Sequence, residues 1–279
     1  MLFRSIIPIN DTSGLGFLPG VDLQFMVGSL AVVFLTSLRI GAFLIASPFF
    51  GGTSVPIQAR ILLAILLGIS VFSVVPAPDL KSFEALSIFR VIIVELTIGI
   101  AAGLILTIWF SAALLAGEKI ASSAGLGFAA QVDPDSGGQT PVVSKTLSLF
   151  LTVIFLSWDG HLLVLRAVAD SYGFLPIGAT PDFYELIKGG VSAAGYMFIA
   201  AAIIMLPLTM FLMATNLVIG VITRSAPQLN LFSFGFPISM LAIFILFYLW
   251  VGSLGSALDE LSRSSVEDLM TILGRALNG

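Results

Sequence analysis

Long apolar stretches separated by single charged residues dominate the chain. Leu23 to Phe50 is apolar except for Arg39, and Leu96 to Gly117 contains no charged residue. A helix of about 20 apolar residues is long enough to cross the hydrocarbon core of a bilayer. The pattern therefore predicts membrane-spanning helices over these two segments.

Four further apolar stretches match a bilayer poorly. Ile61 to Val75 and Thr146 to Trp158 are too short for a core roughly 30 Å thick, at about 1.5 Å per residue. Gly189 to Thr223 and Ser225 to Leu258, separated by Arg224, would each form a helix of roughly 50 Å. That length exceeds the core even at a tilt of about 40°. We interpret the mismatch as helices that pack mainly against other subunits of an assembly.

The C-terminal tail has a different pattern. Its apolar residues recur at helical spacing and its charged residues fall on other faces, which predicts an amphipathic helix over residues 259–279. The apolar set is Leu258, Leu261, Val266, Leu269, Leu273 and Leu277. This helix would either cap the domain or provide a docking surface for a partner.

Composition excludes several classes of protein. The chain is 58% hydrophobic and only 10% charged, whereas an ordinary soluble domain carries about 25% charged residues. The net charge of −4 argues against binding to nucleic acid. Without cysteine and with one histidine, metal centres and His-dependent triads are not expected. The composition predicts an all-α integral membrane protein, and no linker divides its 279 residues into separate domains.

Ala121 to Gln139 is the most informative segment for function. Gly125 and Gly127 allow positive φ and a close approach of the backbone, so this stretch could fold as a tight, pliable loop. An apolar loop of small residues can close a pore by excluding water and ions. The alternative is a helix contact built from small residues. The residues alone leave both interpretations open.

Three polar side chains are candidates for a site. Arg39 and Glu95 interrupt apolar stretches, and a charge inside the membrane is a functional candidate by default. We favour a structural ion pair, formed either between these two residues or with partner subunits. His161 follows Asp159 and Gly160, and a hydrogen-bonded position in a turn is expected. The sequence has neither an HExxH nor a GxSxG motif, so no enzymatic activity is predicted.

A series of short motifs runs through the chain in a fixed order. They are Arg39-Ile40-Gly41, Ser47-Pro48-Phe49-Phe50-Gly51, Val55-Pro56 with Arg60, Gly117-Glu118, Gly125-Leu126-Gly127-Phe128, Val132-Asp133-Pro134, Asp159-Gly160-His161-Leu162, Leu175-Pro176-Ile177-Gly178, Arg224-Ser225-Ala226-Pro227-Gln228-Leu229-Asn230 and Gly235-Phe236-Pro237. This ordered set resembles the FliR family of flagellar export-gate proteins, which also contains the T subunit of injectisomes. The motif at residues 224–230 is more similar to the flagellar members.

The resemblance implies a non-enzymatic, pore-forming subunit of the type III protein export gate, without cofactors, in the bacterial inner membrane at the flagellar basal body. Its implied partners are the P and Q subunits (FliP and FliQ), together with FlhB and FlhA, and unfolded export substrates. The fold implied is an assembly of long and short kinked helices and hairpins. Residues 1–188 would be P-like, 189–258 a Q-like long helical hairpin, and 259–279 the C-terminal helix.

The resemblance also implies roles for individual residues. The part of the family's plug that closes the resting gate matches Gly125, Leu126, Gly127, Phe128 and Gln131. Structural rather than catalytic roles are implied for Arg39, Pro48, Asp133, Pro134, Gly160, His161, Arg224, Pro227 and Gln228. The alternatives are the equivalent injectisome subunit and a secondary transporter of a small solute. A transporter should carry matching broken helices in both halves, and the Gly-rich break at residues 125–138 has no counterpart.

Overall fold

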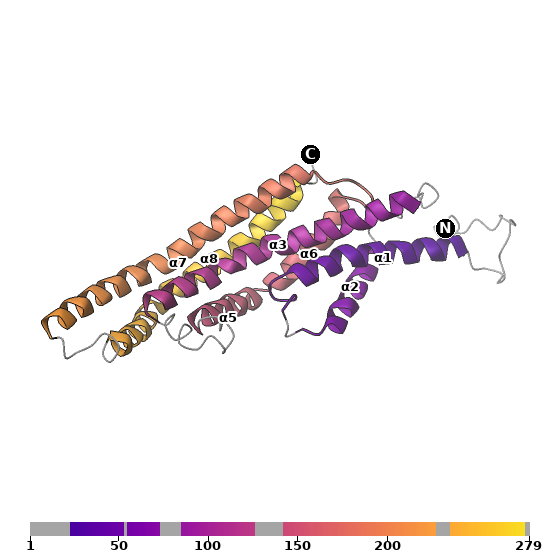
Figure 1. Ribbon diagram of the computed structural model, residues 1–279. Helices are drawn as coiled ribbons and strands as arrows, with labels where there is room; N and C mark the ends of the chain where they lie inside the picture. Colours follow the sequence, from indigo (N-terminus) through magenta and orange to yellow (C-terminus); the bar gives the residue numbers. More distant parts are fainter. Residues whose placement is uncertain (1–22, 53–54, 73–84, 126–141, 227–234, 277–279) are drawn as a thin grey trace.

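The computed structural model describes residues 23–52, 55–72, 85–125, 142–226 and 235–276, and most of these residues lie in helices (Figure 1). The helices are α1 (Leu23–Ala46), α2 (Ile57–Phe72), α3 (Ala85–Ser123), α5 (Val142–Ser157), α6 (Gly160–Phe174), α7 (Phe183–Ser225) and α8 (Phe236–Ala276). Within the described ranges the chain is all-α, which confirms the predicted fold class.

Three helices are much longer than a bilayer requires. At about 1.5 Å per residue, α3, α7 and α8 are roughly 58, 64 and 62 Å long. Of the described helices, α1, α3, α7 and α8 are long and apolar enough to cross a membrane. A fifth candidate is the pair α5 and α6, which is bent by 69° between its two helices. The predicted mixture of short and over-long apolar helices is therefore present.

Two boundaries differ from the sequence prediction. The predicted span from Leu96 to Gly117 is the middle of α3, which continues in both directions past charged residues. The predicted C-terminal helix is the second half of α8, which runs without a break across Leu258. Four of its apolar residues, Leu261, Val266, Leu269 and Leu273, are buried against the rest of the chain. The helical spacing of these apolar residues correctly indicated a helix with one buried face, but that helix does not begin at residue 259.

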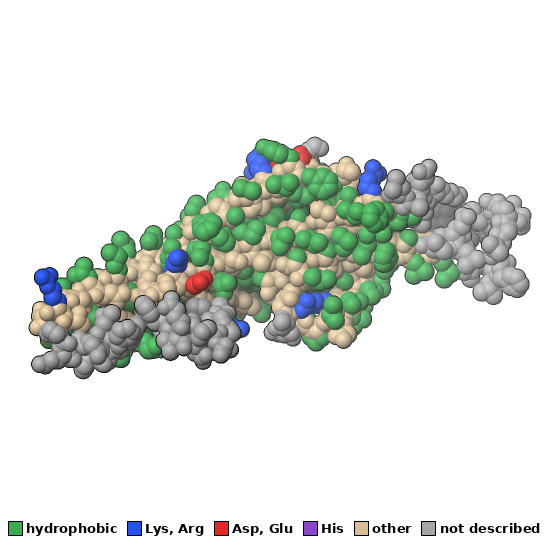
Figure 2. Space-filling model, viewed as in Figure 1, with side chains coloured by type: hydrophobic (Ala, Val, Ile, Leu, Met, Phe, Trp, Pro, Cys, Tyr) green, Lys and Arg blue, Asp and Glu red, His purple; other side chains and the backbone are tan. Residues whose placement is uncertain are grey.

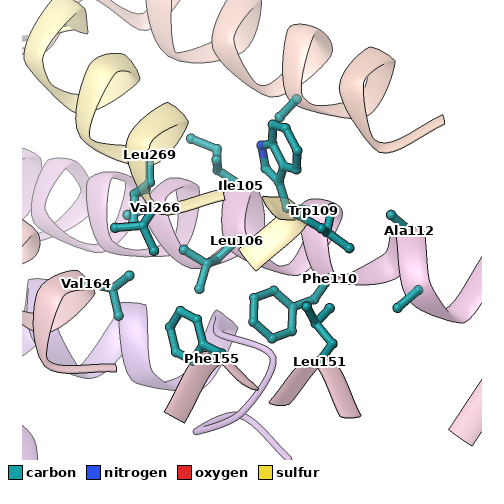
Figure 3. Close-up of a cluster of buried hydrophobic side chains, with 14 of the residues drawn as sticks. Ile105, Leu106, Trp109, Phe110, Ala112, Leu151, Phe155, Val164, Val266 and Leu269 are labelled. Carbon is teal, nitrogen blue, oxygen red and sulfur yellow. The ribbon is translucent and has the colours of Figure 1, made fainter. Parts of the chain in front are cut away.

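Helix α3 forms the centre of the fold. It packs against α1 on one side and against α5, α7 and α8 on the others (Figure 1). Its side chains Leu106 and Phe110 lie within a buried apolar cluster, close to Phe155 of α5 (Figure 3). The rings of Phe110 and Phe155 meet edge to face, with centroids 5.2 Å apart. On another face of α3, Trp109 stacks on Tyr196 of α7, and its indole N–H donates to Asp268 of α8 over 2.8 Å.

Two glycines allow α1 and α3 to approach closely. A Cβ atom at Gly99 would lie only 2.8 Å from the Cβ of Ala42 and would also meet the backbone carbonyl of Arg39. At Gly103, an added Cβ would lie 2.6 Å from the Cβ of Ala46. Gly99 and Gly103 are four residues apart, so they line the same face of α3 as a GxxxG motif. The contact between α1 and α3 is therefore made by backbone against backbone.

We expect Gly99→Ala to destabilise the protein by about 1–3 kcal/mol, because the new methyl group would force α1 away from α3. Gly220→Ala in α7 is the matched control, since nothing lies within 4 Å of its added Cβ. That change should be neutral or stabilise by up to about 1 kcal/mol through helix propensity. Thermal unfolding of the protein, purified together with any subunits that it binds, measures both. Equal effects at the two positions would refute the close approach.

Large apolar side chains cover much of the outer surface (Figure 2). Half of the apolar window of α3 is buried, compared with 22% of that of α7 and 28% of that of α8. Exposed residues follow α7 over most of its length: Val191, Phe198, Ile203, Met210, Met213, Leu217 and Val221 are examples. An apolar surface of this extent is unfavourable in water, so these side chains must be covered either by lipid or by other protein subunits.

Candidate functional site

The charged residues Arg39 of α1 and Glu95 of α3 form a buried ion pair. The Arg39 Nε donates to Glu95 Oε2 over 2.7 Å, and Nη2 donates to Oε1 over 3.1 Å. Both side chains are completely buried. The pair is bidentate: two parallel N–H groups of the planar guanidinium bind the two oxygens of one carboxylate. The sequence left open whether these charges pair with one another or with partner subunits, and here they pair with one another.

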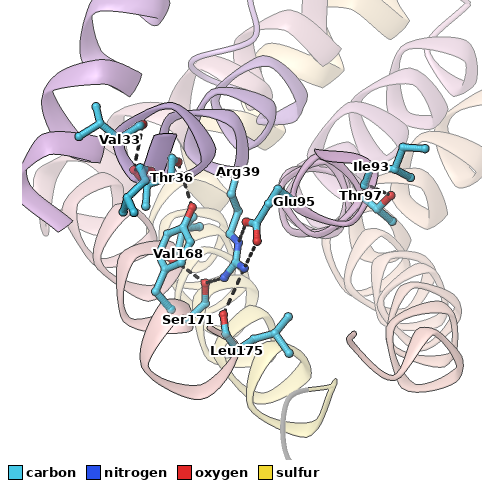
Figure 4. A network of polar contacts seen from close by, with 11 residues as sticks. Val33, Thr36, Arg39, Ile93, Glu95, Thr97, Val168, Ser171 and Leu175 are labelled. Atoms are coloured by element: carbon cyan, nitrogen blue, oxygen red, sulfur yellow. Dashed lines mark hydrogen bonds and ion pairs between the residues drawn. The ribbon is translucent and has the colours of Figure 1, made fainter. Parts of the chain in front are cut away.

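Groups from α6 and from the segment after it accept from two of the three guanidinium N–H groups that Glu95 does not bind. Arg39 Nη1 donates to Ser171 Oγ over 2.9 Å, and Nη2 donates to the Leu175 carbonyl over 3.2 Å (Figure 4). The ring of Tyr172 covers the guanidinium, with Cζ 3.9 Å from the ring centroid. We call Arg39, Glu95, Ser171, Tyr172 and Leu175 the arginine cluster.

The arginine cluster extends to α2 through its neighbours. Tyr172 donates its hydroxyl proton to the Thr36 carbonyl over 2.9 Å. The Thr36 hydroxyl lies 3.3 Å from the Gly68 carbonyl of α2 and also bonds back within α1. One set of hydrogen bonds thus joins α1, α2, α3 and α6. A charge pair taken wholly out of water is costly to form, and the hydrogen bonds of Arg39 to Glu95, Ser171 and the Leu175 carbonyl offset part of that cost. The arrangement holds helices together and presents no exposed group to a reactant.

The Gly-rich segment begins where α3 ends. Gly125 has φ of 81°, in the left-handed region that glycine adopts readily, and its N–H donates to the Ser122 carbonyl. The other predicted plug residues, Leu126, Gly127, Phe128 and Gln131, lie outside the described residues. At the far side of the segment, α5 starts beside α3, because Gly117 packs directly on the Ser144 backbone. The start of α5 is therefore packed against the later part of α3.

Pro48 and Gly160 occupy two sharp bends. Pro48 lies in the turn that follows α1, where the neighbouring Phe49 ring packs 4.8 Å from that of Phe155. Gly160 starts α6 directly after Asp159, whose φ of 60° is left-handed. A Cβ at Gly160 would collide with the Phe155 ring, at 2.7 Å, so only glycine fits there. This bend separates α5 from α6.

The structure corrects the expectation for His161. It lies in the first turn of α6, and its Nδ1 atom is buried without a hydrogen-bond partner among the described residues. The Asp159 backbone carbonyl instead accepts from the N–H groups of Leu162 and Leu163. The Asp159 side chain makes no capping hydrogen bond to α6, so proximity in sequence did not produce the expected bond between this acid and the histidine.

The remaining predicted residues are only partly described. Arg224 lies exposed in the last turn of α7, where a basic side chain favours the helix dipole. Asp133, Pro134, Pro227 and Gln228 lie outside the described residues. Across the described ranges, no group of three or more His, Asp or Glu residues could hold a metal ion.

Sequence reasoning missed several members of the arginine cluster. Ser171 and Tyr172 are ordinary residues in α6 with no local signal of their role. The Leu175-Pro176-Ile177-Gly178 motif was recognised, but not the use of its first carbonyl as an acceptor for Arg39. The spacing of Gly99 and Gly103 was a readable signal of close helix packing that went unused.

Comparisons with known proteins place the chain in a family. Residues 30–265 match the family of bacterial export proteins, family 1. Among similar proteins is the flagellar biosynthetic protein FliR of Pectobacterium carotovorum, 32% identical over 77% of this chain and 82% of the relative. FliR of Escherichia coli is 31% identical over 76% and 80%, and FliR of Bacillus subtilis 26% over 86% and 93%. The chain therefore belongs to family 1 of the bacterial export proteins, the family of FliR.

Proposed function

We propose that this protein is a non-enzymatic, pore-forming subunit of the flagellar type III protein export gate in the bacterial inner membrane. The observation that carries the proposal is the match to the export family over residues 30–265, together with relatives such as those of Pectobacterium carotovorum and Escherichia coli that are named for flagellar biosynthesis. Those names favour the flagellar system over the equivalent injectisome subunit. Unfolded flagellar proteins would cross the membrane through the pore that the subunit helps to form.

The exposed apolar surface supports a role within a hetero-oligomer. Helices α7 and α8 contact one another, are each roughly 60 Å long and leave most of their apolar surface uncovered. A bilayer core about 30 Å thick can cover only about half of that length. We propose that the P and Q subunits, FliP and FliQ, cover the rest, and that FlhB and FlhA join the same assembly. The division into a P-like part, residues 1–188, and a Q-like hairpin, 189–258, belongs to this proposal.

We propose that the segment from Gly125 to Gln131 closes the resting pore. Its start is geometrically suited to a change of chain direction, because Gly125 takes a left-handed conformation directly after α3. The packing of Gly117 on the Ser144 backbone holds together α3 and α5, the two helices that the segment connects. Apolar residues such as Leu126 and Phe128 would exclude ions from the closed pore by excluding water.

Co-expression with the P and Q subunits tests the assembly. The chain should purify through its own tag as a discrete hetero-oligomer of fixed mass, measured by native mass spectrometry, and should aggregate when expressed alone. The physical reason is the uncovered apolar length of α7 and α8, which needs protein partners. A stable monomer or dimer that ignores both co-expressed subunits would contradict the proposal and would favour a small-solute transporter instead.

A further inference from the structure

Asn216 is the one amide side chain in the long uncharged stretch of α7 from Gly189 to Thr223. The side chain is exposed on the surface of the described chain, yet both ends of its amide are hydrogen-bonded to other helices. Its Nδ2 donates to the Ser123 backbone carbonyl over 2.9 Å, and its Oδ1 accepts from Ser239 Oγ over 3.1 Å. A single side chain of α7 therefore connects the end of α3 to the start of α8.

The carbonyl that Asn216 binds belongs to the last residue of α3. The final carbonyls of a helix have no partner within the helix and must find one elsewhere. The Ile120 carbonyl accepts from the Ala124 N–H, and the Ser122 carbonyl accepts from the Gly125 N–H, both over 3.0 Å. The Ser123 carbonyl points instead to Asn216. The C-terminal cap of α3 is thus completed by a different helix.

We infer that Asn216 is a positioning residue that fixes the end of α3, and with it the exit of the chain at Gly125, to the α7–α8 pair. Its hydrogen bonds run to two other helices, whereas the neighbouring Thr215 hydroxyl bonds only within α7, to the Phe211 carbonyl. A role of Asn216 in gating depends on the proposed function of the segment after Gly125. If the segment after Gly125 closes the pore, movement of α7 against α8 is transmitted to the base of that segment through Asn216.

Spin labels can measure this connection directly in the assembled gate complex. The chain has no cysteine, so Ser122→Cys and Val221→Cys introduce two unique labelling sites, both exposed, on α3 and α7. Double electron–electron resonance then gives the distribution of distances between the two labels. We expect one narrow distribution in the otherwise unchanged protein, because the Ser123 carbonyl is held by Asn216.

Three substitutions separate the two hydrogen bonds. Asn216→Leu removes both, Asn216→Asp keeps the acceptor for Ser239 but loses the donor to Ser123, and Ser239→Ala removes only the second bond. We expect the first two to raise the population of displaced distances roughly three- to twenty-fold, which corresponds to the strength of single side-chain hydrogen bonds between membrane helices. Ser239→Ala should have a smaller effect. Thr215→Val is the matched control and should leave the distribution unchanged.

Distance and ion permeability together distinguish this inference from the proposed function. An unchanged distribution in Asn216→Leu, or equal broadening in Thr215→Val, would overturn the positioning role. Should the Asn216 variants fail to assemble, Ser239→Ala alone still decides. Ser239 holds the oxygen of the Asn216 amide whose nitrogen binds the Ser123 carbonyl, so a distribution as narrow as that of the unchanged protein would show that α8 takes no part in fixing the end of α3. Broadening in Asn216→Leu within a gate that stays ion-tight in vesicles would uphold the positioning role and count against the plug.

Discussion

Replacing Glu95 by alanine is expected to destabilise the protein by about 3–5 kcal/mol, because the Arg39 guanidinium would remain buried without its counter-ion. A loss of this size is a large fraction of the stability of a folded protein. Ser171 and the Leu175 carbonyl would still accept two hydrogen bonds, but neither neutralises the charge. The expected result is a strong fall in the amount of chain recovered in the gate complex, and a lower unfolding temperature for what remains.

An exposed ion pair in the same chain is the matched control. Arg166 and Asp170 form a pair one helical turn apart on α6, over 3.4 Å, with side chains that are 77% and 62% exposed. Asp170→Ala should cost no more than about 0.5 kcal/mol, since water screens such a pair. The double change Arg39→Met with Glu95→Leu should recover part of the loss, because no charge is left unpaired. If Glu95→Ala were no worse than Asp170→Ala, the arginine cluster would not hold the helices together.

Removal of residues 126–131 is expected to make the assembled gate permeable to ions. The proposed plug is apolar, so its loss would allow water, and then ions, to fill the pore. The measurement is the fluorescence change of an ion-sensitive dye that is enclosed in vesicles whose membrane contains the purified complex. The change spares Gly125 and the packing of Gly117 on Ser144, so α3 and α5 keep their described contacts.

A replacement of residues 126–131 by six glycines and serines is the control for loop length. It should leak as the deletion does, because the apolar side chains and not the chain length are proposed to seal the pore. Native mass spectrometry on the same samples shows that the complex is intact. An intact complex that stays ion-tight after both changes would exclude this segment as the plug.

The uncharged stretches of the sequence were sufficient to predict the class of fold. A chain with 10% charged residues cannot cover itself with a water-facing surface, so helices in contact with lipid or protein follow from composition. The same reasoning misplaced the ends of α3 and the start of the last helix. It treated Glu95 and Asp259 as boundaries, whereas Glu95 is neutralised by Arg39 inside the fold and Asp259 lies on the outer, partly exposed face of α8.

Candidate residues were recognisable where the sequence itself is unusual. A charge in an apolar stretch is rare, and that rarity singled out Arg39 and Glu95. Ser171 carries no such mark, and Asn216 stands out only as the one amide in its uncharged stretch. Hydroxyl and amide groups occur in many helices without a defined role. The importance of these two residues comes from partners that are 132 and 93 positions away in the chain.

The sequence by itself determined the membrane class, the long apolar helices, the ordered motifs of the family and the pair of charges that needed a partner. Only the tertiary structure decided that those charges pair with one another, that Gly99 and Gly103 bring α1 onto α3, and that Asn216 caps a helix other than its own. The physical reason is that composition and periodicity report the local environment of each residue. Contacts between distant helices depend instead on how complementary surfaces fit together, which no single stretch of sequence contains.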